Sequence, residues 1–214
     1  MSKGIFITIE GGDGAGKTTL ISRLNEQIYI HTQQRTVPTR EPGGSPIAEA
    51  IRSVILDRKH TRMDPRTEAL LYAAARRQHL MEIVKPAIES NKIVICDRFV
   101  DSSLAYQGYA RGLGMDEVWE INRFATEGCM PDITLYLDID PVVAMSRILT
   151  NNTREINRLD LENISFHQKV REGYLQVAAK FPDRIVVLDA SQAPDALALE
   201  AWAIIEAKLS RKPS

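Results

Sequence analysis

The residues best suited to chemistry stand in one stretch, GGDGAGKTTL, at 11–20. Gly11, four further residues, Gly16, Lys17 and Thr18 match the Walker A pattern. Glycines let backbone N–H groups converge on phosphate oxygens, and the start of a helix adds positive potential there. Lys17 is expected to reach the β and γ phosphates, and Thr18 to bind Mg²⁺. The stretch predicts a nucleoside triphosphate site made of Gly11, Gly12, Asp13, Gly14, Ala15, Gly16, Lys17, Thr18 and Thr19.

Asp13 places a carboxylate among those glycines. A carboxylate beside a triphosphate is repelled unless it faces another group. The stretch alone does not identify that group, and a water molecule on Mg²⁺ is one candidate. The alternative is an aspartate that is exposed to solvent in a loop.

The Walker A pattern alone does not say what becomes of the phosphate. A GTPase needs an NKxD motif, and the nearest counterpart, NKIV at 91–94, has valine in place of the carboxylate. The missing motif also argues against a non-enzymatic nucleotide switch. A motor or transporter ATPase needs an acid at the end of an apolar run, which VICD at 94–97 and LYLD at 135–138 both satisfy weakly.

The elements that position these residues alternate along the chain. Helical spacing of apolar residues extends over about 18–33 and 65–89, and further helices are expected from about Pro141 and over about 160–180. Between them lie apolar runs that are typical of strands buried on both faces. The alternation predicts a single α/β domain over 1–214, with a parallel sheet of about five strands flanked by helices. The five expected strands are 4–10, 36–39, 92–97, 133–139 and 184–189.

One helix and two loops carry further local patterns. In the helix over 65–89, the expected buried stripe leaves Tyr72 beside it. Two loops, TREPGGSP at 39–46 and TNNTREINR at 150–158, break the strand and helix rhythm. Ligands of open α/β sheets bind at the carboxyl ends of strands, so both loops are expected near the site. The expected stripe consists of Leu70, Ala73, Ala74, Leu80, Val84 and Ala87.

The composition excludes several classes of protein. Lys and Arg total 27 against 28 for Asp and Glu, and the net charge of -1 gives no general attraction to nucleic acid or an anionic membrane. No apolar run reaches membrane-spanning length, and a secretory segment is not expected. Cys96 and Cys129 have no metal-binding spacing and are expected to be reduced thiols. A cytoplasmic location is expected.

The stretch VICDRFVDSSLAYQGYARG, at 94–112, is specific enough to choose among these classes. Together with TREPGG at 39–44, Asp13 and the arginine-bearing loop before Asp160, it resembles the bacterial thymidylate kinases, over nearly the whole chain. The resemblance implies a P-loop nucleoside monophosphate kinase-like fold with a short lid at about 148–160. It also implies transfer of the γ-phosphoryl group of ATP to dTMP, with Mg²⁺, and a homodimer formed through helices around 70–90 and 100–125.

The resemblance implies how the acceptor phosphate is held. Asp97 and Arg98 match the family's DR(Y/F) signature, in which the arginine grips that phosphate through its planar fork of donors. The alternative for Arg98 is a surface ion pair with Asp101. Arg40 is a second candidate at the phosphate, and Glu41 is expected beside it. A cis bond before Pro42 is left open.

The resemblance also implies how the acceptor nucleoside is recognised. Tyr72 is expected to stack on thymine and Arg76 to bind the base edge, with a core role as the alternative for Tyr72. Ser103 and Gln107, one helical turn apart, look like further base contacts. The remaining implied contacts are Arg52 on the base, Tyr106 against the 2′ side of the sugar and Asp13 on the 3′-hydroxyl.

Catalysis is expected to depend on cations. The acceptor phosphate is largely dianionic at neutral pH, so no base is needed, and repulsion of about 4 kcal/mol per pair of charges opposes its approach. Lys17, Arg98 and Arg158 are the predicted catalytic residues. Some thymidylate kinases carry an arginine in the Walker loop where this chain has Gly14, so the further cation is expected from another element. Arg158 matches a lid arginine of the family, although Asn157 replaces the acid before it.

Alternatives remain for this assignment. Arg147, Arg154 and Arg158 all lie in or near the lid, and each has the alternative of solvating a polar loop. A kinase acting on nucleosides is the alternative enzyme class, although deoxynucleoside kinases carry ERS where DRF stands here, at 97–99.

Overall fold

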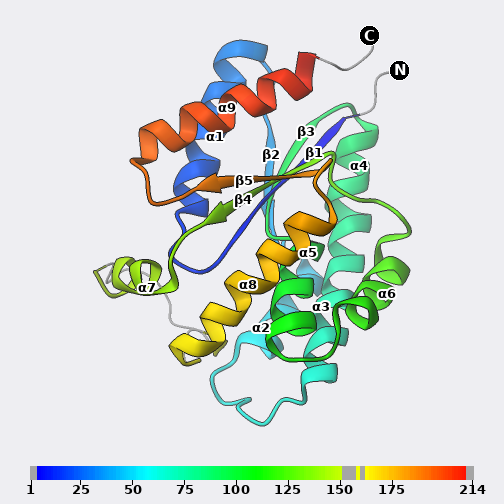
Figure 1. The fold of residues 1–214 in the computed structure, drawn as a ribbon. Coiled ribbons are helices and arrows are strands. Elements are labelled where there is room, and N and C mark those ends of the chain that lie inside the picture. Colours follow the sequence, from blue (N-terminus) through cyan, green and yellow to red (C-terminus); the bar gives the residue numbers. More distant parts are fainter. Residues whose placement is uncertain (1–3, 151–157, 160–161, 211–214) are drawn as a thin grey trace.

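Five parallel strands form the centre of the molecule, in the order β2-β3-β1-β4-β5 (Figure 1). The structure is a computed structural model that describes residues 4–150, 158–159 and 162–210. The five predicted strands and the parallel α/β fold are confirmed. The strands are β1 (Ile5–Gly11), β2 (Val37–Arg40), β3 (Ile93–Asp97), β4 (Ile133–Asp138) and β5 (Ile185–Asp189).

Helices connect the strands and cover both faces of the sheet (Figure 1). The α-helices are α1 (Lys17–Thr32), α2 (Pro46–Leu56), α3 (Pro65–His79), α4 (Lys85–Glu89), α5 (Val100–Ser103), α6 (Met115–Thr126), α7 (Pro141–Thr150), α8 (Ile164–Lys180) and α9 (Pro194–Ser210). Two π-helical segments are η1 (Leu80–Val84), which joins α3 to α4, and η2 (Leu104–Ala110), which follows α5.

The central strand β1 contributes side chains to two separate hydrophobic cores, one on each face of the sheet. Successive side chains of a strand point to opposite faces, so Ile7 and Phe6 enter different layers. Ile7 lies in a cluster with Leu24 of α1 and Trp202 of α9. Phe6 lies in the cluster on the other face, with Tyr174 of α8. Burial on both faces explains why this run is apolar without alternation.

One predicted boundary and one predicted burial pattern differ from the structure. The helix expected over 160–180 begins at Ile164, because the side chain of Asn163 accepts a hydrogen bond from the backbone N–H of Phe166 at 2.9 Å and caps it. The edge strand β2 alternates in burial instead of being buried on both faces. Part of the expected lid, 151–157 and 160–161, lies outside the described residues.

The predicted buried stripe of α3 is wrong at two positions. Leu70 is 56% exposed and Ala74 is exposed, whereas Tyr72 and Arg76 are buried. Glu68, Tyr72 and Arg76 follow one another at a spacing of four, so they form one face of the helix. That face can turn inward because its charged groups, Glu68 and Arg76, have hydrogen-bond partners, and an apolar pattern cannot reveal such a face.

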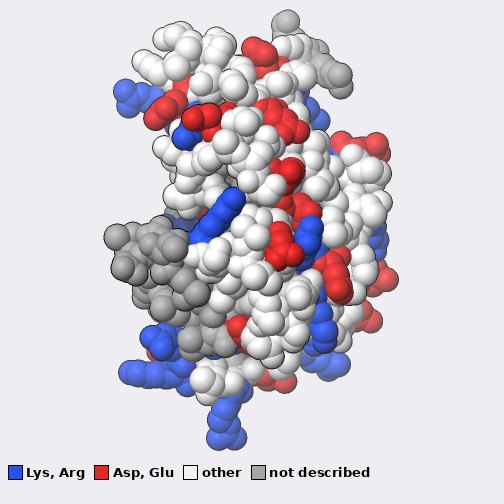
Figure 2. Space-filling model, turned by 60° about the vertical axis from the view of Figure 1, so that its left-hand side comes forward, with Lys and Arg blue, Asp and Glu red and all other residues white. Residues whose placement is uncertain are grey.

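Charged side chains of both signs are mixed over the face in Figure 2. Lys and Arg gather at its lower end, where the loop between α2 and α3 lies in Figure 1. Arg58 and Lys59 of that loop line the cleft described below. Positive charge is thus concentrated locally, in a chain whose net charge is -1.

Two further expectations concern membranes and thiols. Within the described residues, helices that combine the length and the apolar character needed to cross a membrane are absent. Cys96 is buried and Cys129 half-buried, and both are free thiols, as expected.

Candidate active site

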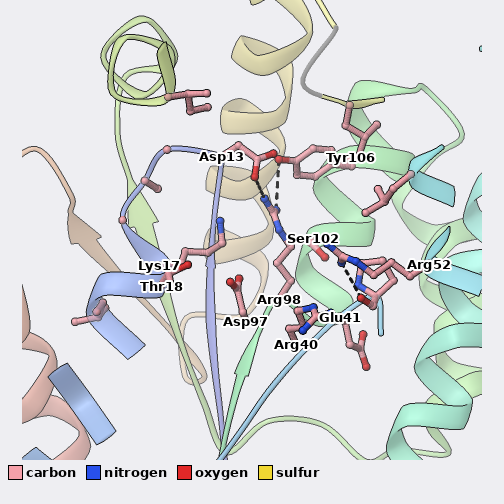
Figure 3. Close-up of a pocket in the computed structure, with 18 of the residues that line it drawn as sticks. Asp13, Lys17, Thr18, Arg40, Glu41, Arg52, Asp97, Arg98, Ser102 and Tyr106 are labelled. Carbon is pink, nitrogen blue, oxygen red and sulfur yellow. Dashed lines mark hydrogen bonds and ion pairs between the residues drawn. The ribbon is translucent and has the colours of Figure 1, made fainter. Parts of the chain in front are cut away.

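A cleft of about 1580 Å³ opens at the carboxyl ends of β1, β2 and β3. Single small ligands usually occupy roughly 300–1,000 Å³, so this cleft has room for more than one. Lys17 and Thr18 stand on one side of Arg98, and Arg40, Glu41 and Arg52 on the other (Figure 3). The two predicted ligand sites therefore share one space.

The P-loop, residues 11–19, consists of the loop between β1 and α1 together with the last residue of β1 and the first residues of α1. Gly16 precedes α1 with φ 94°, a left-handed conformation that glycine adopts without strain. Gly14 has φ 80°, and a side chain there would collide with the backbone carbonyl of Ala144. An arginine cannot occupy this slot without moving α7, so cations must come from other elements.

Lys17 lies across the P-loop. Its Nζ donates hydrogen bonds to the carbonyl oxygens of Gly11 at 3.1 Å and Gly12 at 3.0 Å, and the residue is 7% exposed. Burial lowers the pKa of Lys17, and the positive charge of Arg98 lowers it further. An anion between the two cations offsets this repulsion.

Asp97 and Thr18 fit a site for Mg²⁺. Both line the cleft, and Asp97 Oδ1 is buried without a hydrogen-bond partner among the described residues. Such an orphan oxygen needs a partner that the protein does not supply. Clusters of three or more His, Cys, Asp or Glu side chains that could hold a metal ion are absent within the described ranges.

Arg98 occupies a strained position at the end of β3. Its φ is 70°, and its backbone N–H donates to Ile9 O at 3.0 Å. Its guanidinium donates to Asp13 Oδ1 at 3.0 Å and to the hydroxyl of Tyr106 at 3.4 Å. A left-handed conformation in a non-glycine residue is costly and is often found at functional sites.

The alternative ion pair of Arg98 with Asp101 is wrong. Asp101 is 1% exposed and binds Arg184 through two hydrogen bonds of 2.7 Å. The solvated alternative for Asp13 is also wrong, because its side chain is 19% exposed and paired with Arg98. Asp13 thus connects the P-loop to the predicted acceptor side.

Glu10 supports this arrangement and was missed by the sequence analysis. It is fully buried, and its carboxyl oxygens accept hydrogen bonds from Phe99 N at 2.6 Å and from the Tyr174 hydroxyl at 2.9 Å. The same hydroxyl accepts from Arg98 at 3.3 Å. Burial, with the charge of Asp101, raises the pKa of Glu10 to about 8. A glutamate that ends an apolar run was the available signal.

Two further arginines line the cleft beside Arg98. Arg40 pairs with Glu49 at 2.9 Å, and Arg52 donates to the carbonyl of Pro42 at 2.8 Å. Burial lowers the pKa of Arg52, and the charge of Arg40 lowers it further. The Glu41–Pro42 bond is cis. This end of the cleft therefore favours a multiply charged anion.

The predicted base pocket is divided into two layers. Tyr72, Tyr106 and Gln107 line the cleft. Arg76 lies behind them and is 1% exposed, and its Nε donates to Glu41, which also lines the cleft, at 2.7 Å. Their direct contact with a ligand stays a prediction.

Ser103 also lies behind the cleft wall. Its Oγ accepts from Arg76 Nη1 at 3.1 Å, and Ser102 lines the cleft in its place. A π-helical turn follows a spacing near five rather than four, so Ser102 and Gln107 share the face that the sequence assigned to Ser103.

Comparisons with known proteins agree with this geometry. A sequence profile of the family described as thymidylate kinase matches residues 9–200. The chain belongs to the thymidylate kinase family. Thymidylate kinases from Bacillus thuringiensis (strain Al Hakam) and Bacillus mycoides (strain KBAB4) are 58% and 59% identical to it over 207 residues, 97% of this chain and 99% of each relative.

A solved structure supports the same family. The crystal structure of thymidylate kinase from Ehrlichia chaffeensis matches with a TM-score of 0.76 and 33% identity, over 95% of this chain and 99% of that one. The expected P-loop nucleoside monophosphate kinase-like fold is therefore confirmed. The chain is an enzyme of the nucleoside monophosphate kinase class, as its resemblance to thymidylate kinases predicted.

One end of the cleft was not foreseen from the resemblance to thymidylate kinases. Arg147 lines it, with Nη1 donating to Ala190 O at 3.0 Å, and Gln192, Pro194 and Leu197 complete the wall. These residues stand beside the P-loop, at the far end from Arg40. The loop after β5 and the start of α9 gave no motif in the sequence.

The lid arginine that thymidylate kinases place at the transferred phosphate lies elsewhere in this structure. Arg158 is 8% exposed, and its guanidinium contacts Glu68 of α3 and the carbonyl of Ile55 of α2, the latter at 3.1 Å. To reach a phosphate it would have to leave Glu68. Its catalytic role stays a prediction, and Arg154 lies outside the described residues.

Proposed function

We propose that this chain transfers the γ-phosphoryl group of ATP to dTMP and releases dTDP, in the synthesis of dTTP. The carrying observation is that Lys17, at the start of the helix after β1, and Arg98, directly after the neighbouring strand β3, face one cleft with room for two nucleotides. Two anions meet there between cations on either side. The positions of the cations along the cleft indicate which end of the cleft binds the donor nucleotide and which binds the acceptor.

The donor occupies the P-loop end. The backbone N–H groups at the start of α1 and the ammonium of Lys17 hold its phosphates. Thr18 and Asp97 hold Mg²⁺, which when bound neutralises part of the phosphate charge. The adenine end lies against Arg147 and the loop after β5, since those residues continue the cleft beyond the P-loop.

The acceptor occupies the Arg98 end. Arg98 and Arg40 hold the phosphate of dTMP. Asp13 accepts a hydrogen bond from the 3′-hydroxyl of the sugar, and Tyr72 stacks on thymine. Tyr106 lies against the 2′ side of the sugar, which disfavours ribose only modestly because an added hydroxyl in an apolar contact is weakly rejected.

Catalysis is electrostatic. A dianionic phosphate is already a nucleophile, so the task of the protein is to hold it in line and to offset its repulsion of the donor. Lys17 and Arg98 are on fixed elements, and their positions are set before the ligands arrive. Preorganised charge of this kind costs little reorganisation during reaction.

The experiment is a coupled ADP-release assay with dTMP, dUMP, dCMP, thymidine and no acceptor. Turnover with dTMP above the rate without acceptor supports the proposal, and the rate with thymidine should equal the background. A rate that is the same with and without dTMP contradicts the proposal. Preferential turnover with thymidine would instead support a nucleoside kinase.

We propose in addition a cytoplasmic homodimer. The proposed interface lies on helices around 70–90 and 100–125, and it is supported by an exposed apolar side chain on each of α3 and α6, Leu70 at 56% and Phe124 at 88%. Such residues are expected to be covered by a second copy. Light scattering should give twice the chain mass of 24.0 kDa. Phe124→Glu should shift the mass towards one chain, and an unchanged mass would contradict this interface.

A further inference from the structure

One buried carboxylate contacts both the predicted base pocket and Arg158. Glu68 of α3 is 1% exposed. Its Oε1 accepts from Gln107 Nε2 at 2.9 Å and from Arg111 Nε at 3.4 Å, and its Oε2 pairs with the guanidinium of Arg158. The proposed function gives Glu68 no role, and the residue does not line the cleft.

The contact with Gln107 fixes the orientation of the Gln107 amide. An ionised carboxylate can only accept hydrogen bonds, so the NH₂ end of the amide must face Glu68. The carbonyl is then the end of the amide that remains for a ligand. Gln107 is 2% exposed, and it lines the cleft beside Tyr72 and Tyr106.

We propose that Glu68 is a positioning residue that sets the pyrimidine selectivity of the enzyme through Gln107. Held this way, Gln107 offers an acceptor to the ring N3–H of thymine or uracil. Cytosine has no hydrogen on N3 and presents an acceptor there, so two acceptors would face each other. This inference rests on the proposed function, because it requires the base to lie beside Tyr72.

The two arginines keep Glu68 in its acceptor role. Arg111 bridges Glu68 and Glu162, the latter at 2.7 Å, and it stacks over Phe166 with 4.6 Å to the ring centroid. Arg158 pairs with the other carboxylate oxygen of Glu68, Oε2. A buried carboxylate with two guanidinium partners accepts hydrogen bonds on both oxygens and is fixed in place, which a lone carboxylate would not be.

The test is Glu68→Gln, read as the ratio of kcat/KM for dUMP to kcat/KM for dCMP. These substrates both lack the methyl group and differ at N3 and the 4-position. A glutamine at 68 can turn its own NH₂ towards Gln107, whose amide then reverses and offers a donor to the base. We expect a ratio of at least about 10² in the wild type and a fall of at least tenfold in the variant, mainly through KM.

The ratio of kcat/KM for dUMP to kcat/KM for dCMP separates an effect on the orientation of Gln107 from the other effects of Glu68→Gln. Loss of the charge next to Arg158 alters turnover of both substrates alike, so it cancels. Glu162→Gln removes the neighbouring ion pair of Arg111 without touching Gln107 and should keep the wild-type ratio. In a Gln107→Ala background, Glu68→Gln should change the ratio no further.

The outcomes decide the inference in either direction. An unchanged ratio in Glu68→Gln, or an equal fall in Glu162→Gln, overturns it while leaving the dTMP kinase activity in place. A wild type that phosphorylates no pyrimidine nucleotide overturns the proposed function as well. If Glu68→Gln does not fold, a crystal structure of the wild type with dUMP decides: Gln107 Oε1 should lie within hydrogen-bond distance of N3, and any other partner on N3 overturns the inference.

Discussion

Asp13 of the P-loop and Arg98 at the end of β3 form a charged hydrogen bond of 3.0 Å between Oδ1 and Nη2. The pair joins the loop that is proposed to hold the donor to the residue that is proposed to hold the acceptor. It also explains an acid among phosphate-binding glycines, because the carboxylate faces a cation. The two proposed half-sites are thus connected through one contact.

We predict that Asp13→Asn lowers kcat/KM for dTMP at least about tenfold, because Arg98 loses its charged partner and the acceptor its hydrogen-bond acceptor. The KM for ATP should change less than about threefold, since Lys17 is untouched. Steady-state kinetics with each substrate varied checks this. Asp116→Asn, which breaks an exposed pair with Lys180, should behave as the wild type. A change confined to the KM for ATP would contradict the assignment.

Arg98 has a second testable property, its backbone strain. Replacement by alanine or glycine should remove the grip on the acceptor phosphate, with kcat/KM for dTMP lower by about 10² or more in both. Glycine adopts φ 70° without the cost that alanine carries, so Arg98→Gly should be more stable than Arg98→Ala by about 1 kcal/mol. Thermal unfolding checks the difference, and equal stabilities would show that the strain is absent.

The raised pKa of Glu10 predicts how the stability of the fold depends on pH. Its pKa is raised from 4.5 to about 8 by burial and by Asp101, so the folded protein holds this proton more tightly than the unfolded chain. The contribution to stability is therefore full below about pH 4.5 and is lost as the pH rises through about 8. Glu10→Gln should weaken the fall in melting temperature between about pH 5.5 and pH 8. Identical slopes in the two proteins would contradict the raised pKa.

Arg158 has a structural role that the sequence did not indicate. Arg158→Ala removes one of the two guanidinium partners described for Glu68, leaving Arg111 and the amide of Gln107, and should lower the free energy of unfolding by about 2 kcal/mol. Arg123→Ala, which breaks an exposed pair with Glu120, should cost less than about 0.5 kcal/mol.

The same variant tests the catalytic role predicted for Arg158. A fall in kcat of about 10³-fold in the folded variant, with little change in the KM for dTMP, would support a contact with the transferred phosphate. Near-normal turnover together with lowered stability would show that Arg158 only anchors its segment to α2 and α3.

The sequence predicted the five strands and the P-loop because their signals are local. An apolar run such as 92–97 is bounded by turn residues, and the Walker A pattern fixes both a loop and the helix that follows it. The resemblance to thymidylate kinases then supplied candidates for the acceptor site, whose contacts with dTMP stay predictions. Arg98, Tyr72, Tyr106, Gln107 and Arg40 all line the cleft, as that resemblance implied.

The rest depends on contacts between distant segments. Glu10 and Phe99 are 89 residues apart in sequence, and Glu68 and Arg158 are 90 apart, so neither pair leaves a pattern in the chain. The π-helical turn of η2 changes the face that each residue presents, which moved Ser103 behind the wall. Buried polar faces such as that of α3 are invisible to hydrophobic periodicity.

The most direct test of the central claim is a crystal structure with dTMP and a non-hydrolysable ATP analogue bound together. The account predicts that the guanidinium of Arg98 lies within hydrogen-bond distance of the dTMP phosphate, and that Lys17 Nζ contacts the β or γ phosphate of the analogue. A complex in which the dTMP phosphate lies away from Arg98 would contradict it.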